Sequence, residues 1–277
     1  MTLKRRFADA TALRELRVTR VNPDTTAASS PTSAPGGFST AAEQAVPGRI
    51  AEVFSQSSDE LSVKLANFPR YARRQHITRF AALYELFKLV LPVKGSIVEC
   101  GVFRGFSFAT FAQLSAALEP TNLTRRVYGF DTFEGFAAVS SADAPERTGA
   151  QVGDLESDSF EELNRLIDIY DDDRFLGHIP KSRLIKGDVS QTIPSFIEDN
   201  QHLVVSLLFL DMDLYEPTLT ALEHFVPRMP KGAVLAFDEL DNPIWPGETS
   251  AVLKRFNLGD LALRRFEFDP YISYAIL

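Results

Sequence analysis

The sequence predicts an α/β protein with a mostly parallel, seven-stranded sheet, helices on both faces and an antiparallel hairpin at its C-terminal end. Three observations predict this fold. Short apolar runs that end in glycine or an acid recur from residue 96 onward. Helical stretches separate these runs, as expected for strand–helix–strand units. The final residues read as two short strands joined around Pro270.

The five parallel strands are predicted from apolar runs without polar alternation, which are typical of strands buried on both faces. These runs cover residues 96–102, 126–131, 182–188, 205–211 and 233–239. The helices predicted between them cover residues 105–118, 158–170, 190–199 and 215–227. The hairpin strands are predicted on either side of Pro270 and complete the count of seven.

Two regions are predicted before the sheet. Residues 1–47 are expected to form a flexible arm and linker, because a basic start leads into a stretch of small, polar, Pro and Gly residues. Residues 48–95 are expected to form a helical cap. In its second half Ile77, Phe80 and Leu83 begin an apolar pattern with three- and four-residue steps. The domain that carries the chemistry is then residues 96–277.

Composition excludes several classes of protein. The 277 residues carry a net charge of −8, whereas a nucleic-acid binder normally shows a basic face. The single cysteine, Cys100, rules out an intrachain disulfide and a multi-cysteine zinc site. No apolar run reaches the roughly 18 residues of a membrane span, and no signal peptide is visible. We therefore expect a cytoplasmic protein that binds neither nucleic acid nor membrane. The basic start leaves a transit peptide open as an alternative.

The stretch "VECGVFRGFSFATF" follows the first predicted strand and opens a helix. Gly101 and Gly105 allow a tight turn, and the helix start offers N–H groups to an anionic ligand. Asp131 ends the second strand, where an acid can accept hydrogen bonds from ribose hydroxyls. Gly187 and Asp188 end the third strand, where they could meet an adenine. The third glycine of the dinucleotide fingerprint is missing, so a tight turn without a ligand stays open beside an adenosine-containing cofactor.

Clustered acids end the fourth and fifth strands. Asp211 and Asp213 follow one run, and Asp238 and Glu239 follow the other. If these strands are neighbours, their ends lie about 5 Å apart. Carboxylates that close need a shared proton or a cation, and oxygen ligands favour Mg²⁺, Mn²⁺ or Ca²⁺. Capping of the following helices is the alternative for at least one of them.

Taken together, "VECGVFRGFS", "YGFDTFEGF", "LDMDLYEPT" and "GAVLAFDE" resemble the class I S-adenosylmethionine-dependent methyltransferases, which have a Rossmann-like fold. The closest resemblance is to the macrocin O-methyltransferase family, over residues 75–255 or so. It implies a metal-dependent O-methyltransferase that transfers a methyl group from S-adenosylmethionine to a hydroxyl of a sugar or another vicinal-diol natural product. The acceptor is then a small hydroxylated molecule, expected to be glycosylated, from a pathway such as antibiotic biosynthesis.

The resemblance also implies roles for single residues around the cofactor. It places Glu99, Gly101, Gly105 and Ser107 at the methionine end of S-adenosylmethionine. It places Asp131 at the ribose. It places Asp188, which follows Gly187 at the end of the third strand, near the adenine.

For the reaction itself, the resemblance assigns Asp211, Asp238 and Glu239 to a divalent metal, Mg²⁺ or another cation such as Mn²⁺. It makes Asp213 the general base, so that Asp211 and Asp213 are the catalytic acids. One departure is visible, because the family usually has a second aspartate where this chain has Glu239. The stretch "LDNPIWPGE" after it also differs, so the resemblance leaves the acceptor open.

Alternatives remain beside this interpretation. A dehydrogenase would show a third glycine and a Tyr-x-x-x-Lys relay, and neither is present. A metal-dependent hydroxylase or oxidoreductase on the same fold, and a non-catalytic binding protein, stay open. Residues 137–157 are either a lid or a surface insertion. Trp245 either walls the acceptor pocket or packs under a loop. Apolar helix faces near residues 50–90 make a homodimer an expectation.

Overall fold

The computed structural model describes residues 40–277, so most of the predicted arm lies outside the described residues. The chain divides into two units, residues 1–46 and 47–277, and the second holds the whole sheet. Helix α1 spans Ala41–Gln56 and so begins earlier than residue 48, where the sequence predicts the first helix. Pro47 lies inside this helix, which is why its first turns read as linker.

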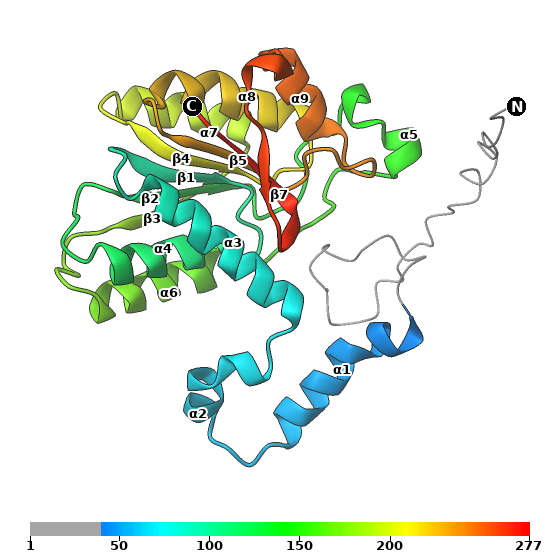
Figure 1. The fold of residues 1–277 in the computed structure, drawn as a ribbon, viewed down its shortest axis with the longest axis vertical. Coiled ribbons are helices and arrows are strands. Elements are labelled where there is room, and N and C mark those ends of the chain that lie inside the picture. Colours follow the sequence, from blue (N-terminus) through cyan, green and yellow to red (C-terminus); the bar gives the residue numbers. More distant parts are fainter. Residues whose placement is uncertain (1–39) are drawn as a thin grey trace, which may run out of the picture. The chain divides into compact units, whose positions relative to one another are not determined.

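The sheet has seven strands in the order β3-β2-β1-β4-β5-β7-β6 (Figure 1). Strands β1 to β5 are parallel to their neighbours, whereas β7 runs antiparallel to both β5 and β6. This confirms the mostly parallel sheet and its C-terminal antiparallel pair. The strands are β1 Ser96–Cys100, β2 Val127–Asp131, β3 Ser182–Lys186, β4 Val205–Leu210, β5 Val234–Phe237, β6 Arg264–Phe266 and β7 Asp269–Ile276.

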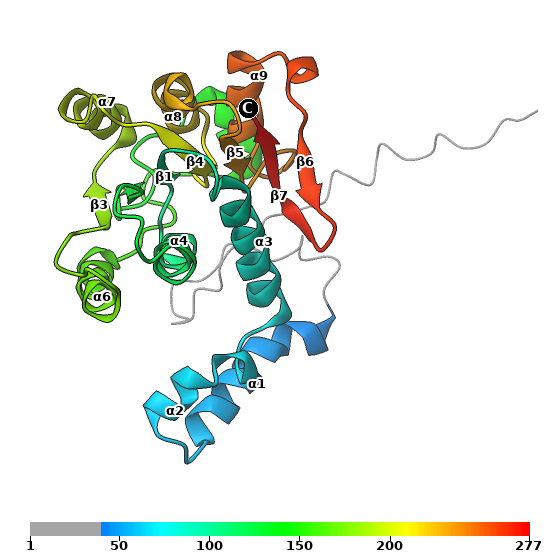
Figure 2. The same cartoon turned by 60° about the vertical axis from the view of Figure 1, so that its left-hand side comes forward.

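Helices cover both faces of the sheet, as Figure 1 and the turned view in Figure 2 show. One face carries α3 (Arg74–Val90), α4 (Phe106–Leu118) and α6 (Phe160–Asp173), and the other carries α7 (Val189–Asp199), α8 (Tyr215–Phe225) and α9 (Gly247–Arg255). Alternate residues of a strand point to opposite faces. In β4, Leu207 and Phe209 therefore belong to the first core, while Leu208 and Leu210 belong to the second.

The remaining short helices are α2 (Leu61–Ala66), before the sheet, and α5 (Pro145–Thr148), between β2 and α6. Helix α9 is a correction, because the sequence predicts no helix after the fifth strand. Its start carries Pro246 and Gly247, which read as a turn. A Cβ on Gly247 would lie 2.5 Å from the carbonyl oxygen of Asp213, so only glycine lets this helix approach so closely.

The register of the three central strands sets the position of the site. Cys100 of β1 lies beside Leu210 of β4, which in turn lies beside Phe237 of β5. The next residue of each strand therefore leaves the sheet at the same edge. Within residues 40–277, no helix combines the length and the apolar character needed to cross a bilayer.

Candidate active site

The ends of β1, β4 and β5 bring the predicted acids together. Asp211 donates its backbone N–H to Cys100 O at 2.9 Å, and Asp238 donates to Leu210 O at 3.0 Å. Each strand thus stays hydrogen-bonded to its neighbour for one residue past its end. The predicted convergence of two acidic strand ends on one edge of the sheet is confirmed.

An arginine that the sequence analysis did not single out bridges the two strand ends. Arg79 of α3 donates to Asp211 Oδ2 at 2.7 Å and to Asp238 Oδ1 at 2.5 Å. It also donates to Ser107 Oγ, at 3.3 Å. The predicted acid pair therefore holds a guanidinium from a helix outside the strands.

Arg79 was missed because the apolar pattern predicted for α3 is buried from Leu83 onward but not at its start. Ile77 and Phe80, with which the predicted stripe begins, are 41% and 40% exposed. The residues of α3 that are buried are Ala82, Leu83, Leu86, Phe87 and Val90. Arg79 precedes these at the same three- and four-residue steps. Arg79 could have been predicted from its position, because a basic residue aligned with the buried face of a helix points toward the protein interior.

The acids outnumber this arginine. Burial raises the pKa of Asp211 well above its usual range, and the neighbouring Asp238 raises it further while Arg79 opposes the shift. Burial raises the pKa of Asp213 in the same way, followed by Asp211 and Glu239. Burial, with Asp238, raises the pKa of Glu239 to about 7. Burial lowers the pKa of Arg79, but Asp238 and Asp211 raise it by more, so its pKa lies above the usual range.

Glu99 of β1 belongs to the same cluster. It is almost wholly buried, and its Oε2 atom has no hydrogen-bond partner among the described residues. Burial raises its pKa well above the usual range, with Asp211 as the next cause, while Arg79 lowers it. An orphaned carboxylate oxygen here leaves capacity for a ligand at the position predicted for the methionine end of the cofactor.

Glu248 of α9 is a second residue that the sequence analysis missed. Its side chain is fully buried and accepts N–H bonds from the loops after β4 and β5, from Met212 at 3.4 Å and from Glu239 at 3.0 Å. Glu248 therefore fixes the two acidic loops relative to each other. It was missed because it lies in the unpredicted helix α9.

Asp213 has a left-handed backbone, with a φ of 62°, and is largely buried. A non-glycine residue with this conformation is uncommon and marks a position held by its surroundings. Gly247 packs against its carbonyl oxygen, and the Met212 N–H bond to Glu248 lies one residue earlier. Contacts on both sides thus hold the predicted general base in place.

The two glycines of the predicted cofactor loop are required by the chain itself. Gly101 has a φ of 94°, and a Cβ there would lie 1.8 Å from the carbonyl oxygen of Asp211. Gly105 has a φ of 82°, and a Cβ there would lie 2.4 Å from Leu163 Cδ2. Close internal packing thus explains both glycines. Ser107, buried in the first turn of α4, lies directly beyond this loop.

Asp131 closes the same loop from the end of β2. Its carboxylate accepts the N–H of Phe103 at 2.7 Å and that of Phe133 at 2.6 Å, one on each oxygen. A carboxylate oxygen can accept a second hydrogen bond, so both oxygens keep capacity for a ligand. Gly187 donates its N–H to Asp131 O at 2.9 Å, which brings the end of β3 beside this acid.

Asp188 caps helix α7, because its side chain accepts the N–H of Ser190 at 2.9 Å. Helix capping, which was the alternative role for the acids after the fourth and fifth strands, is thus seen for the acid after the third strand. An adenine contact by Asp188 stays a prediction.

The segment 137–157 is fastened beside Asp213. Asp143 is buried and accepts the N–H of Tyr215 at 2.6 Å and that of Ser140 at 2.7 Å. Trp245 packs edge-on against Phe136, with ring centroids 5.8 Å apart. Trp245 thus packs against the small apolar cluster of Phe136, Ala150 and Leu214, as the second alternative expects, and a role in the acceptor pocket stays a prediction.

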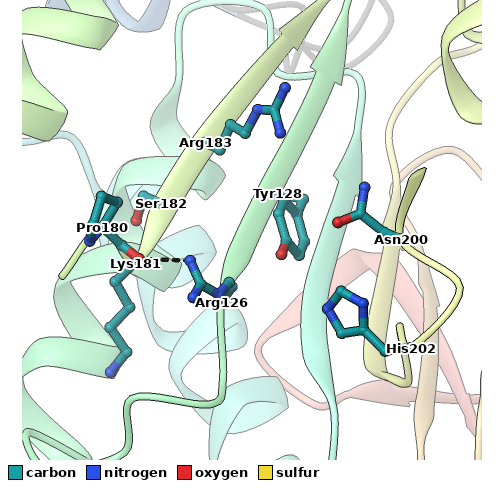
Figure 3. Close-up of a pocket in the computed structure, with 8 residues that line it drawn as sticks. All are labelled: Arg126, Tyr128, Pro180, Lys181, Ser182, Arg183, Asn200 and His202. Atoms are coloured by element: carbon teal, nitrogen blue, oxygen red, sulfur yellow. Dashed lines mark hydrogen bonds between the residues drawn. The ribbon is translucent and has the colours of Figure 1, made fainter. Parts of the chain in front are cut away.

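A separate cavity of about 320 Å³ lies at the opposite ends of β2 and β3 (Figure 3). Arg126 donates to the carbonyl oxygen of Pro180 at 2.9 Å along its rim. The cavity is basic and lies away from the acids, so it is not part of the candidate site. Its lining residues are Arg126, Tyr128, Pro180, Lys181, Ser182, Arg183, Asn200 and His202.

A sequence profile described as a methyltransferase domain matches residues 98–240, more than half of the chain. The chain belongs to this family. A search of curated proteins finds no match. Among solved structures, this methyltransferase is similar to CalS11, described as a calicheamicin methyltransferase, with 35% identity and a TM-score of 0.82. That match covers 86% of this chain and 93% of CalS11.

A second structure of CalS11, described as apo TDP-rhamnose 3′-O-methyltransferase, has 34% identity and a TM-score of 0.76 over 86% of this chain and 95% of the other. The O-methyltransferase NovP, with 23% identity and a TM-score of 0.58 over 72% and 79%, shares the fold. These matches confirm the predicted family and fold. The methyltransferase is an S-adenosylmethionine-dependent O-methyltransferase.

The donor chemistry of the cluster fits a hard divalent cation. Asp211, Asp238 and Glu239 offer only oxygen ligands, and a positive group already lies between the first two. That group is the guanidinium of Arg79. Within residues 40–277, no three His, Cys, Asp or Glu side chains are gathered closely enough to hold an ion. In this structure the guanidinium of Arg79 thus lies between two of the three predicted metal ligands.

Proposed function

We propose that this methyltransferase methylates a hydroxyl of a sugar in natural product biosynthesis, with Mg²⁺ or another divalent cation such as Mn²⁺. The observation that carries the proposal is the convergence of Asp211 and Asp238, from adjacent strands, on one positive group. The similarity to CalS11, described as acting on TDP-rhamnose, supports a sugar acceptor. A nucleotide-linked deoxysugar is therefore the first acceptor to test.

In this proposal Asp211, Asp238 and Glu239 hold the metal. A divalent cation bound there would lower the pKa of an acceptor hydroxyl and orient it. The three carboxylates lose their mutual repulsion when a cation is shared between them. Glu248 supports the arrangement because it accepts the backbone N–H of Glu239.

Asp213 is the proposed general base. Its burial and its neighbours Asp211 and Glu239 raise the pKa of its carboxyl, so it binds a proton more readily than an exposed aspartate. A base of this kind suits removal of a proton from a hydroxyl near neutral pH. The held backbone at this residue limits how far the carboxyl can move.

The cofactor is proposed to lie along the loop from Glu99 to Ser107. S-adenosylmethionine supplies an electrophilic methyl group when it is bound. Asp131 would accept hydrogen bonds from the ribose, because both of its oxygens keep capacity beyond their backbone N–H bonds. The end of β3, with Asp188, would lie near the adenine.

The proposal is tested by calorimetric titration with S-adenosylmethionine and by methyl-transfer assays on a panel of vicinal diols that includes TDP-rhamnose. Turnover is expected to require a divalent metal and to stop in EDTA. Asp211→Asn and Asp238→Asn are expected to lose metal-dependent turnover while they still bind S-adenosylmethionine. Cofactor binding without turnover on any diol would argue for a hydroxylase or a binding protein instead.

A homodimer in the cytoplasm is also part of the proposal. Helix α2 and its surroundings expose several apolar side chains, among them Leu61, Leu65 and Phe68 at 63%, 64% and 55%. Exposed apolar patches are typical of subunit interfaces. Light scattering on the full chain, with Leu65→Asp and Phe68→Asp as variants, measures whether a dimer forms through this surface.

A further inference from the structure

We propose that Arg79 is an exchangeable counter-cation, which holds Asp211 and Asp238 together until a divalent metal displaces it. This inference rests on the metal-dependent part of the proposed function. It assigns a role to a residue outside the strands and outside the predicted motifs. Metal binding then becomes an exchange of one cation for another.

The geometry supports a bridging role. The two terminal nitrogens of Arg79 each donate to a different aspartate, at 2.7 and 2.5 Å. The aspartates belong to separate loops, after β4 and after β5. One guanidinium thus spans the gap between two strand ends, and its planar fork suits two carboxylates at once.

The balance of charge shows why the bridge is incomplete. Four further acids near this pair are buried: Glu99, Asp213, Glu239 and Glu248. Within residues 40–277, Arg79 is the basic side chain that forms ion pairs with the acids of this cluster. One positive charge thus pairs with two of six clustered acids, and a cation of higher charge would attract these acids more strongly once they are ionised. A divalent cation supplies twice the charge in a smaller volume.

The surroundings of Arg79 set the cost of displacing it. Its side chain is 16% exposed, and Ile77 and Phe80 on either side of it are also exposed. Its other contacts are a long hydrogen bond to Ser107 Oγ, at 3.3 Å, and the ring of Phe209, whose centroid lies 5.9 Å from the guanidinium carbon. Displacement of Arg79 would therefore cost these weaker contacts as well as its two ion pairs, and a divalent cation shared by the acids must outweigh that cost.

The experiment measures Mn²⁺ binding to the full chain by electron paramagnetic resonance, which detects free Mn²⁺ and needs no turnover. Arg79→Gln removes the competing cation, and Arg74→Gln, an exposed position on the same helix, is the matched control. The Kd for Mn²⁺ is expected to fall about tenfold in Arg79→Gln, equivalent to about 1.4 kcal/mol. Arg74→Gln is expected to match the wild type.

Thermal unfolding supplies a second readout. In EDTA the Tm of Arg79→Gln is expected to lie below that of the wild type, because the acids lose their counter-cation. Mn²⁺ is expected to raise the Tm of Arg79→Gln more than that of the wild type. Arg79→Lys keeps one charge without the fork, so its Kd is expected to lie between the two.

Equal or weaker Mn²⁺ binding by Arg79→Gln would overturn the exchange, because Arg79 would then not compete with the ion. The activity assay distinguishes this from failure of the proposed function. Methyl transfer that persists in EDTA refutes the metal requirement. Metal-dependent transfer with equal Kd values for the wild type and Arg79→Gln refutes only the exchange.

Discussion

Two arginines at opposite ends of the same sheet differ in what surrounds them. Arg125 lies where β1 and β4 begin, and its side chain is 3% exposed. It pairs with Glu119 at 2.9 Å, donates to Ser206 Oγ at 2.5 Å, and donates to backbone carbonyls. The backbone carbonyl oxygens of Val90, Val93 and Gly95 accept hydrogen bonds from the guanidinium of Arg125, each at 2.9 Å. Arg79, at the other end, is more exposed and meets two carboxylates and one hydroxyl.

The difference separates a structural cation from a functional one. Arg125 has one acid and several neutral acceptors, so its donors are used and its charge is balanced. Arg79 is outnumbered by the buried acids around it, and burial together with mutual repulsion raises the pKa of these acids, Asp211 among them. The end of the sheet with balanced charge should govern stability, and the end with clustered acids should govern activity.

The largest effect is expected from Asp213→Asn. Loss of the proposed base should lower kcat by about 10²- to 10⁴-fold while the Tm changes little. Steady-state assays on the best diol of the panel measure it, with exposed Glu216→Gln in the same loop–helix region as the control. Retained activity in Asp213→Asn would assign the base to another group.

Arg125→Met should affect stability instead. It leaves Glu119 and several buried carbonyls without their donor, so the free energy of unfolding should fall by about 3–5 kcal/mol. Urea denaturation measures this, and added Mg²⁺ should not restore it. The neighbouring Arg126→Met loses only a hydrogen bond to Pro180 and should cost far less. A rescue of Arg125→Met by metal would contradict the separation of the two ends.

Glu248→Gln tests the support beneath the acids. The amide retains one acceptor oxygen for two backbone N–H groups, so one of them is left unsatisfied at a cost of about 1–3 kcal/mol. The two loops should also loosen, which should weaken Mn²⁺ binding. Denaturation and Mn²⁺ titration measure the two effects. A variant with normal metal affinity would show that α9 does not fix the loops.

The smallest effect concerns Lys181, near Arg125. Burial lowers the pKa of Lys181 below its usual 10.5, and Arg174 and Arg125 lower it further while Glu119 raises it. The folded state therefore binds this proton less tightly than the unfolded state. Stability should rise with pH from the lowered pKa up to 10.5. Subtraction of Lys181→Met denaturation data should isolate this slope, and an unchanged slope would refute it.

The sheet could be predicted from sequence because each central strand is buried on both faces. Apolar runs such as residues 205–210, where only Ser206 is polar, and 234–237 are shorter than a typical helix, and acids directly after such runs mark the strand ends. Asp211 and Asp238 were therefore predictable as a pair. This part of the site follows from local pattern and general topology.

Arg79 and Glu248 could not be predicted in the same way. Arg79 contacts a loop more than a hundred residues further along the chain, and Glu248 contacts a loop about ten residues before it. Both residues lie on helices whose orientation is set by packing. The apolar pattern predicted for α3 was wrong only at its start, because Ile77 and Phe80 are apolar and yet exposed, whereas Leu83 is buried. Helix α9 was missed because its first residues favour a turn. Tertiary packing decides these positions, and local periodicity does not record it.

The position of Cys100 has a practical consequence. This single thiol is buried at the end of β1, one residue before Gly101, and burial raises its pKa well above the usual range. It should therefore resist alkylation unless this edge of the sheet opens. The rate at which a thiol reagent modifies the native chain then reports opening at the reaction centre, with no engineered probe.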